Sequence, residues 1–124
     1  LSGGQRQRIA IARALLRHAL GWTDAQLLSR AEKTVPPSAA AAFAALAARR
    51  AAGEPVAYLV GTREFYGLPF RVTPAVLIPR PETELLVDLA LERIAPDAAS
   101  RVLDLGTGSG CVALALATHR PQAR

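Results

Sequence analysis

The chain has 124 residues, with 51% hydrophobic and only 5% aromatic side chains, enough for one small core or for parts of two domains. Its formal net charge is +5, but the arginines are scattered, which favours a biased composition over a nucleic-acid-binding patch, so no direct nucleic-acid partner is expected. The single cysteine, Cys111, excludes an internal disulfide, and no apolar run reaches the roughly 18 residues that span a bilayer, so a cytoplasmic protein without metal or membrane segment is expected.

The first 62 residues are predicted to form a helical bundle. Helical spacing of apolar residues indicates a first helix over about residues 6–20, which Gly21 would end. The residues expected on its inward face are Ile9, Ala12, Leu16, Ala19 and Leu20.

Capping residues and prolines indicate three more helices in this bundle. Thr23 or Asp24 would begin the second, and Ser38 would cap a third over residues 39–52. Pro55 would open a short fourth helix. The second helix is expected to turn Leu27, Leu28 and Ala31 inward.

Residues 63–80 are predicted to form a β-hairpin linker. Two short runs rich in β-formers flank Gly67-Leu68-Pro69, the kind of segment that turns a hairpin. Pro81 would then open a helix over residues 82–94. This helix is expected to place Leu85, Leu86, Leu89 and Ile94 against the core.

Residues 81–124 are predicted to be the start of a Rossmann-like α/β domain. After the helix come a buried strand over residues 101–105, a tight glycine loop and a helix over residues 111–118. The fold class is therefore α/β, with an N-terminal helical bundle, a hairpin linker and the opening of a parallel-sheet domain.

The loop after this strand has the spacing of an S-adenosylmethionine site. Its glycines let the backbone approach a ligand closely, and the following helix offers unpaired N–H groups. A P-loop would need a lysine, and a dinucleotide fingerprint would place its third glycine one residue later. The carboxylate of Asp104 suits the cationic amino group of a methionine moiety. The predicted cofactor-binding residues are Asp104, Gly106, Thr107, Gly108, Ser109 and Gly110.

Two readings of this loop stay open at this point. The turn could serve only to pack the helix on the strand. Thr107 and Ser109 could contact a ligand or cap the helix. Cys111 is interpreted as a small core residue rather than a nucleophile.

Three segments together resemble the release factor glutamine methyltransferases, the HemK/PrmC family. They are Val-Leu-Asp-Leu-Gly-Thr-Gly-Ser-Gly-Cys at 102–111, the run from Gly53-Glu-Pro-Val-Ala-Tyr-Leu through Glu64-Phe-Tyr-Gly-Leu-Pro-Phe, and Val-Leu-Ile-Pro-Arg-Pro-Glu-Thr-Glu at 76–84. The resemblance covers about residues 18–124, and the third segment is the most discriminating.

The resemblance implies an enzyme of translation termination. Its reaction would be methyl transfer from S-adenosylmethionine to the side-chain N5 of the glutamine in the Gly-Gly-Gln motif of peptide chain release factors. The implied protein acts as a cytoplasmic monomer with release factors as its substrates. The resemblance also implies that Pro79, Arg80, Pro81 and Glu82 line the active-site region. A favourable helix start would equally explain Pro81 and Glu82.

The Asn-Pro-Pro-Tyr motif, which orients the substrate amide in this family, is absent from these 124 residues. No catalytic residue is therefore assigned. The chain also lacks a starting methionine and a signal peptide, and it is interpreted as a truncated fragment. We expect it to bind S-adenosylmethionine weakly or not at all, and not to methylate.

A second resemblance lies at the start of the chain. Leu-Ser-Gly-Gly-Gln-Arg-Gln-Arg-Ile-Ala-Ile-Ala-Arg-Ala-Leu-Leu at residues 1–16 is similar to the signature segment of ABC-transporter ATPases. No Walker motif accompanies it, so a structural role in the bundle is expected, with a junction between the two resemblances within residues 12–18. The alternatives to a methyltransferase are therefore an ABC ATPase fragment and a non-catalytic helical module that docks a protein partner.

Overall fold

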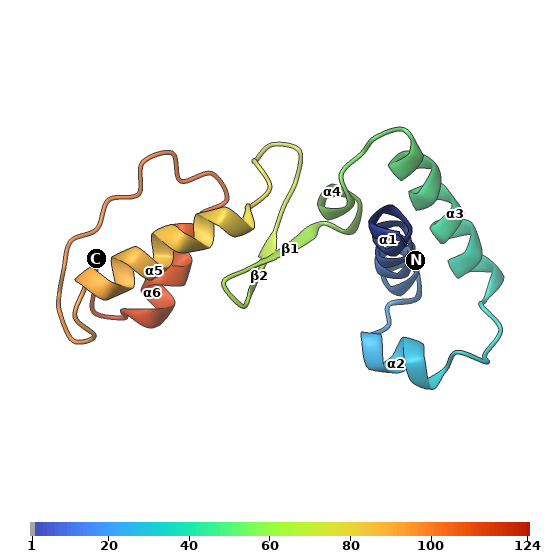
Figure 1. Ribbon diagram of the computed structural model, residues 1–124, viewed down its shortest axis with the longest axis horizontal. Helices are drawn as coiled ribbons and strands as arrows, with labels where there is room; N and C mark the ends of the chain where they lie inside the picture. The colour runs from blue at the N-terminus through green and yellow to red at the C-terminus, as the bar shows by residue number, and fades with distance from the viewer. Residues whose placement is uncertain (1) are drawn as a thin grey trace. The chain divides into compact units, whose positions relative to one another are not determined.

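The computed structural model describes residues 2–124; Leu1, the first residue of the segment that resembles the ATPase signature, lies outside the described residues. The chain divides into two compact units, of which the first ends at Val60 and the second begins at Gly61 (Figure 1). The predicted α/β class is confirmed, with a helical N-terminal part followed by a two-stranded hairpin and further helices.

The first unit is helical. Helix α1 spans Gly3–Leu20, α2 spans Asp24–Ser29, α3 spans Pro37–Ala51 and α4 spans Val56–Val60. Helix α1 packs against α3 and α4, which also contact each other. The buried side chains of these helices are Leu15, Ala39 and Leu59.

The inward face of α1 agrees with the predicted one only in part, since Leu16, Ala19 and Leu20 are half-buried but the face centres on Leu15. Leu15 is 2% exposed, with half-buried Ile11 and Ala19 four residues to either side, whereas Ile9 is 54% exposed. Apolar residues occupy more than one face of α1, so the contacts with α3 and α4 decide which face is buried. The predicted burial of Ala12 in α1 is also wrong, since it is exposed.

Two expectations for α2 and α3 are corrected as well. In α2, Leu27 is half-buried but Leu28 is 70% exposed, and Ala31 lies beyond the end of this helix of six residues. Helix α3 begins two residues earlier than predicted, and Ser38 does not cap it. Pro37 suits the first helical position, where no N–H is needed.

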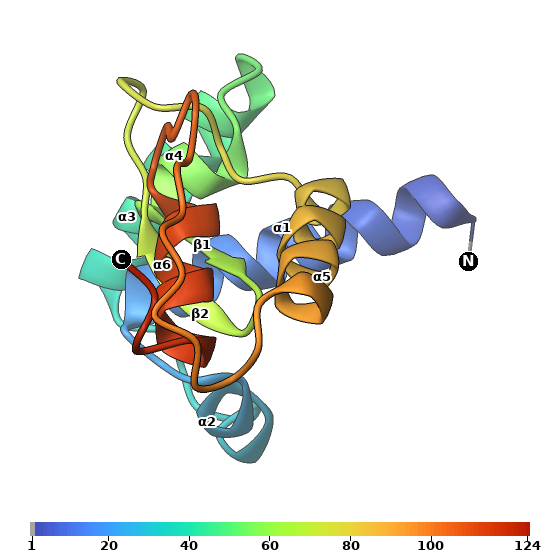
Figure 2. The same cartoon turned by 90° about the vertical axis from the view of Figure 1, so that its left-hand side faces the viewer.

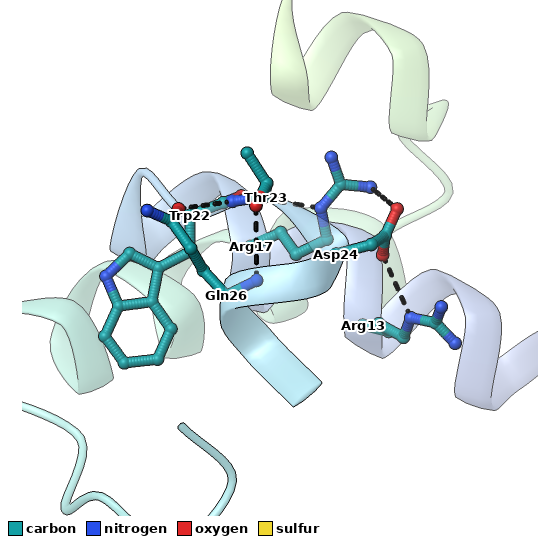
Figure 3. Close-up of polar contacts among 6 residues, drawn as sticks. All are labelled: Arg13, Arg17, Trp22, Thr23, Asp24 and Gln26. Atoms are coloured by element: carbon teal, nitrogen blue, oxygen red, sulfur yellow. Dashed lines mark hydrogen bonds and ion pairs between the residues drawn. The ribbon is translucent and has the colours of Figure 1, made fainter. Parts of the chain in front are cut away.

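Asp24, the first residue of α2, forms ion pairs with two arginines of α1 (Figure 3). Arg13 Nε lies 3.2 Å from one carboxylate oxygen of Asp24, and Arg17 Nη1 lies 2.8 Å from the other. Thr23 and Gln26 form a reciprocal capping box at the start of α2, so Thr23 is the cap of the two residues that the sequence offered, Thr23 and Asp24.

Replacing Asp24 with Asn is expected to destabilise the first unit by about 1 kcal/mol or less, since all three charged side chains are 38–50% exposed. The loss should shrink in high salt, which screens exposed ion pairs. Urea unfolding followed by the fluorescence of Trp22, the single tryptophan, measures it. Glu32→Gln, which removes an exposed acid elsewhere, is the control; an equal loss in both variants would contradict the role of Asp24.

The second unit begins with the predicted hairpin, but its turn is Tyr66-Gly67 rather than the expected Gly67-Leu68-Pro69, so that Leu68 and Pro69 belong to the second strand. Strand β1 (Thr62–Phe65) pairs antiparallel with β2 (Leu68–Arg71), so that Phe65 lies opposite Leu68. Tyr66 and Gly67 both have positive φ, 52° and 73°, as a two-residue hairpin turn of this twist requires.

Helices η1 (Pro81–Thr83), α5 (Glu84–Arg93) and α6 (Cys111–His119) complete the second unit (Figure 2). Helices α5 and α6 pack together, and one face of the hairpin joins them. The rings of Phe65 and Phe70 meet edge to face at 6.2 Å. Cys111 is buried in this core, which confirms its prediction as a core residue. The buried core residues are Phe65, Phe70, Val87, Cys111, Ala115 and Leu116.

The inward face predicted for α5 is wrong. Val87 is fully buried, while Leu85, Leu86 and Leu89 are 60%, 58% and 38% exposed. Tyr66 explains the rotation of this helix: its backbone N–H donates to Glu84 Oε1 at 2.8 Å, and its hydroxyl donates to Asp88 Oδ1 at 2.7 Å. These carboxylates are four residues apart and so share a face of the helix, which turns that face to the hairpin.

The buried strand predicted over residues 101–105 is not formed, and Leu103 and Leu105 are 80% and 83% exposed. Among the described residues the segment has one backbone partner: Val102 N–H donates to the Arg124 carbonyl at 2.7 Å, and Arg124 N–H donates to the Ser100 carbonyl at 2.9 Å. This is the slanted pattern of a parallel pair. A strand needs a ladder along its length, and within residues 2–124 no ladder reaches Leu103 or Leu105.

The hydrogen bond to Asp88 raises the pKa of the Tyr66 phenol above its ordinary value, and the negative charges of Asp88 and Glu84 add to this effect. The neutral phenol is the donor, so the bond stabilises the fold at neutral pH and is lost as pH rises through the folded pKa. In a Tyr58→Phe background, Asp88→Ala is expected to lower the pKa of Tyr66, as measured by phenolate absorbance. Glu92→Ala, an exposed acid on the same helix, should leave the pKa unchanged, and a comparable drop there would refute the assignment.

Candidate functional site

The glycine loop joins the extended segment to α6. Gly106, Gly108 and Gly110 have φ values of 74°, 54° and 78°, in the left-handed region that favours glycine. Gly110 is the N-cap of α6, and a Cβ there would meet Leu114 at 3.6 Å. The loop therefore turns tightly into the helix, with bare backbone on its surface.

Asp104 is half-buried at the start of this loop. The hydroxyl of Thr107 donates to Asp104 Oδ2 at 2.7 Å and so fixes the carboxylate. Neither Thr107 nor Ser109 caps α6, because no side-chain hydrogen bond is made at this helix start. In the part of the chain that the structure describes, Oδ1 of Asp104 accepts no hydrogen bond.

A pocket of about 220 Å³ lies within the second unit and brings two distant segments together. One wall is the glycine loop with Asp104, and the other comes from the segment around Arg80. Pockets that enclose whole drug-sized ligands measure about 300–1,000 Å³, so this one would hold only part of a nucleoside-containing cofactor. Its lining includes Pro79, Arg80, Thr83, Leu86, Asp104, Gly106, Thr107, Gly108 and Ser109.

The pocket contains most of the predicted site residues and some that were missed. Of the predicted residues, Pro81, Glu82 and Gly110 do not line it, and the first two are exposed. Thr83 and Leu86 do line it, although neither was predicted as a site residue and Leu86 was expected to face the core.

Prolines flank Arg80 on both sides and restrict its backbone. Pro79 is buried, and Pro81 begins η1, where its ring sets the first helical position. Arg80 between them is extended, with φ −102° and ψ 139°, as a residue before proline prefers. The Thr83 N–H donates to the Arg80 carbonyl at 3.0 Å and closes the turn.

In the segment that resembles the ATPase signature, Ser2 and Gln5 cap the start of α1. Ser2 Oγ accepts from Gln5 N–H at 3.2 Å, and Gln5 Oε1 accepts from Ser2 N–H at 2.8 Å. This is a capping box, so both side chains serve the helix start.

Neither a metal cluster nor a membrane helix is found in the residues described. No three of the His, Cys, Asp and Glu side chains at positions 2–124 are grouped to hold a metal ion. None of the helices formed by these residues is both long and apolar enough to cross a bilayer.

Comparisons with known proteins agree over both units. Residues 3–61 match the PrmC N-terminal domain, and this match includes most of the signature-like segment. The chain is 59% identical over 113 residues to a protein named release factor glutamine methyltransferase from Burkholderia pseudomallei (strain K96243), covering 91% of this chain and 40% of that protein.

Two further relatives carry the same name. The protein from Bordetella pertussis is 55% identical over 112 residues, which are 90% of this chain and 42% of that protein. The protein from Escherichia coli (strain K12) is 48% identical over 110 residues, which are 89% of this chain and 39% of that protein. The chain thus spans about two-fifths of the length of the curated relatives it matches.

Proposed function

Since this chain is a relative of the release factor glutamine methyltransferases, we propose that it carries the first part of an S-adenosylmethionine site. The enzyme concerned would methylate N5 of the glutamine in the Gly-Gly-Gln motif of peptide chain release factors, as a monomer in the cytoplasm. The observation that carries the proposal is the pocket in which the glycine loop, Asp104 and the Arg80 segment meet.

The residues of the pocket fit this cofactor. S-adenosylmethionine supplies an electrophilic methyl group and carries a cationic amino group on its methionine moiety. The Asp104 carboxylate, oriented by Thr107 and with one oxygen open, would bind that ammonium group by a charge-assisted hydrogen bond. The bare backbone of the loop lets an adenosyl group approach closely.

In this proposal the described residues would hold part of the cofactor, and the residues that orient a glutamine amide in the family are not among them. The amide nitrogen is a poor nucleophile because its lone pair is delocalised, so methylation depends on positioning. The sequence contains no Asn-Pro-Pro-Tyr motif to do this. We therefore propose that the chain binds the cofactor weakly and does not methylate alone.

Calorimetry or ligand-observed NMR on the whole chain tests this proposal. S-adenosylmethionine and S-adenosylhomocysteine are expected to bind, weakly, and ATP is expected not to bind. Incubation with a release factor and methyl-labelled S-adenosylmethionine should give no incorporation. Binding of ATP without binding of S-adenosylmethionine would overturn the cofactor assignment. Methyl incorporation would overturn the proposed inactivity of the chain.

A further inference from the structure

Tyr66 occupies a backbone position that does not suit its side chain. Its φ is 52°, and within residues 2–124 it is the one residue other than glycine with a positive φ. Asn, Asp or Gly adopts this conformation readily at the first position of a two-residue hairpin turn, whereas a bulky side chain is strained there. Such strain persists where surrounding contacts fix the residue, and it concentrates at functional sites. The contacts of Tyr66 therefore indicate what the tyrosine does in this turn.

Three contacts join Tyr66 to two helices at once. Its backbone N–H donates to Glu84 Oε1 at 2.8 Å and its hydroxyl donates to Asp88 Oδ1 at 2.7 Å, and both acceptors belong to α5. Its ring meets the ring of His119, in the last turn of α6, edge to face with 5.1 Å between the centroids. Tyr66 thus holds α5 against α6 from the turn of the hairpin.

The same two helices carry the two walls of the pocket. Thr83 directly precedes α5 and Leu86 lies in its first turn, and both line one wall. The glycine loop that forms the other wall leads into α6, whose first residues, Cys111 and Val112, also line the pocket. The separation of the walls therefore depends on how α5 is placed relative to α6.

Directional contacts fix that placement at two points. At the C-terminal ends of the helices, Arg120 Nε donates to the Ile94 carbonyl at 2.6 Å and Arg120 Nη2 donates to the Leu91 carbonyl at 2.7 Å. Tyr66 supplies the second point, nearer the start of α5. Apolar packing between the helices is not directional, so these hydrogen bonds select one offset of α5 along α6.

We propose that Tyr66 is a positioning residue for cofactor binding, which sets the separation of the two pocket walls by holding α5 against α6. The inference rests on the proposed function and adds to it a residue that determines the geometry of the site. Tyr66 and Asp88 do not line the pocket, so they act on the ligand only through the helices. A site whose supporting contacts leave it about 1 Å too loose loses much of its binding.

The test removes the Tyr66–Asp88 hydrogen bond from either side. Tyr66→Phe keeps the ring, and it is expected to weaken binding of S-adenosylmethionine and S-adenosylhomocysteine by the whole chain about three- to tenfold. Asp88→Ala should give a similar loss, while Asp88→Asn keeps an acceptor oxygen and should retain most of the affinity. Because both changes remove one interaction, the variant with Tyr66→Phe and Asp88→Ala together should bind no more weakly than either alone.

A second measurement reads the pocket without any ligand. In the amide NMR spectrum of the free chain, Tyr66→Phe is expected to shift the resonances of Thr83 on one wall and Gly108 on the other. Two controls should change neither these resonances nor the affinities. Glu92→Ala removes an exposed acid of α5 outside the pocket, and Tyr58→Phe removes the hydroxyl of the other tyrosine, which lies in the first unit.

The outcomes separate this inference from the proposed function. Unchanged affinity in Tyr66→Phe, or an equal loss in Asp88→Asn and Asp88→Ala, overturns the inference while the proposed function stands. If Tyr66→Phe does not fold, the two Asp88 variants decide, because Asp88 is exposed and its replacement leaves the core intact. An unaltered chain that binds neither S-adenosylmethionine nor S-adenosylhomocysteine overturns the proposed function and this inference with it.

Discussion

Replacing Asp104 with Asn is expected to weaken the binding of S-adenosylmethionine by the chain about ten- to a hundredfold. A hydrogen bond to a charged group contributes about 1.5–3 kcal/mol, and Asn keeps the shape of the side chain while it removes the charge. Thr107 can still donate to the amide oxygen, so the loop should keep its conformation. Calorimetry of both proteins measures the change.

The control for this variant is Asp97→Asn, which removes an exposed acid of the same unit outside the pocket. It should bind S-adenosylmethionine as tightly as the unaltered chain. Equal affinity in the Asp104 variant would mean that the backbone of the glycine loop, rather than the carboxylate, holds the ligand.

Replacing Phe65 with Ala is expected to destabilise the second unit by about 3–5 kcal/mol. Phe65 is 1% exposed, packs edge to face on Phe70 and belongs to the cluster that joins the hairpin to α5 and α6. Its removal leaves a cavity that these short elements cannot close. Urea unfolding followed by far-ultraviolet circular dichroism gives the free energy of unfolding.

Leu85→Ala is the matched comparison, because the sequence places this residue inside and the structure places it outside. Because Leu85 is 60% exposed, Leu85→Ala should lower the free energy of unfolding by less than about 1 kcal/mol. If Phe65→Ala is too unstable to study, Phe65→Leu keeps most of the volume and should show a smaller loss in the same direction. A greater loss for Leu85→Ala than for Phe65→Ala would contradict the observed packing.

Local signals in the sequence predicted the elements well. The hairpin, the capping of α2 by Thr23 and the end of α1 at Gly21 each depend on a few neighbouring residues. The buried faces of α1 and α5 could not be predicted in the same way. Both helices are apolar on several sides, and contacts from distant segments, such as Tyr66 with Glu84 and Asp88, select the side that is buried.

The candidate site was predictable in part for the same reason. The glycine loop and Asp104 form a local pattern, and their positive φ values follow from glycine itself. Only the family resemblance predicted that Arg80 lies near this loop. The two segments are more than twenty residues apart in the sequence, so no local pattern connects them. Thr83 and Leu86 enter the pocket through the rotation of α5 and the turn before it, which no local pattern encodes.

Within residues 2–124, the parallel pairing between Val102 and Arg124 leaves the rest of this extended segment without a neighbouring strand. Beyond it, residues 103–105 present open backbone groups flanked by two solvent-exposed leucines. Such an edge is a template on which a second copy can add by β-pairing, so concentrated samples will tend to self-associate. The self-association should weaken on dilution. Leu103→Lys, which adds a charge to this edge, is expected to reduce it as well.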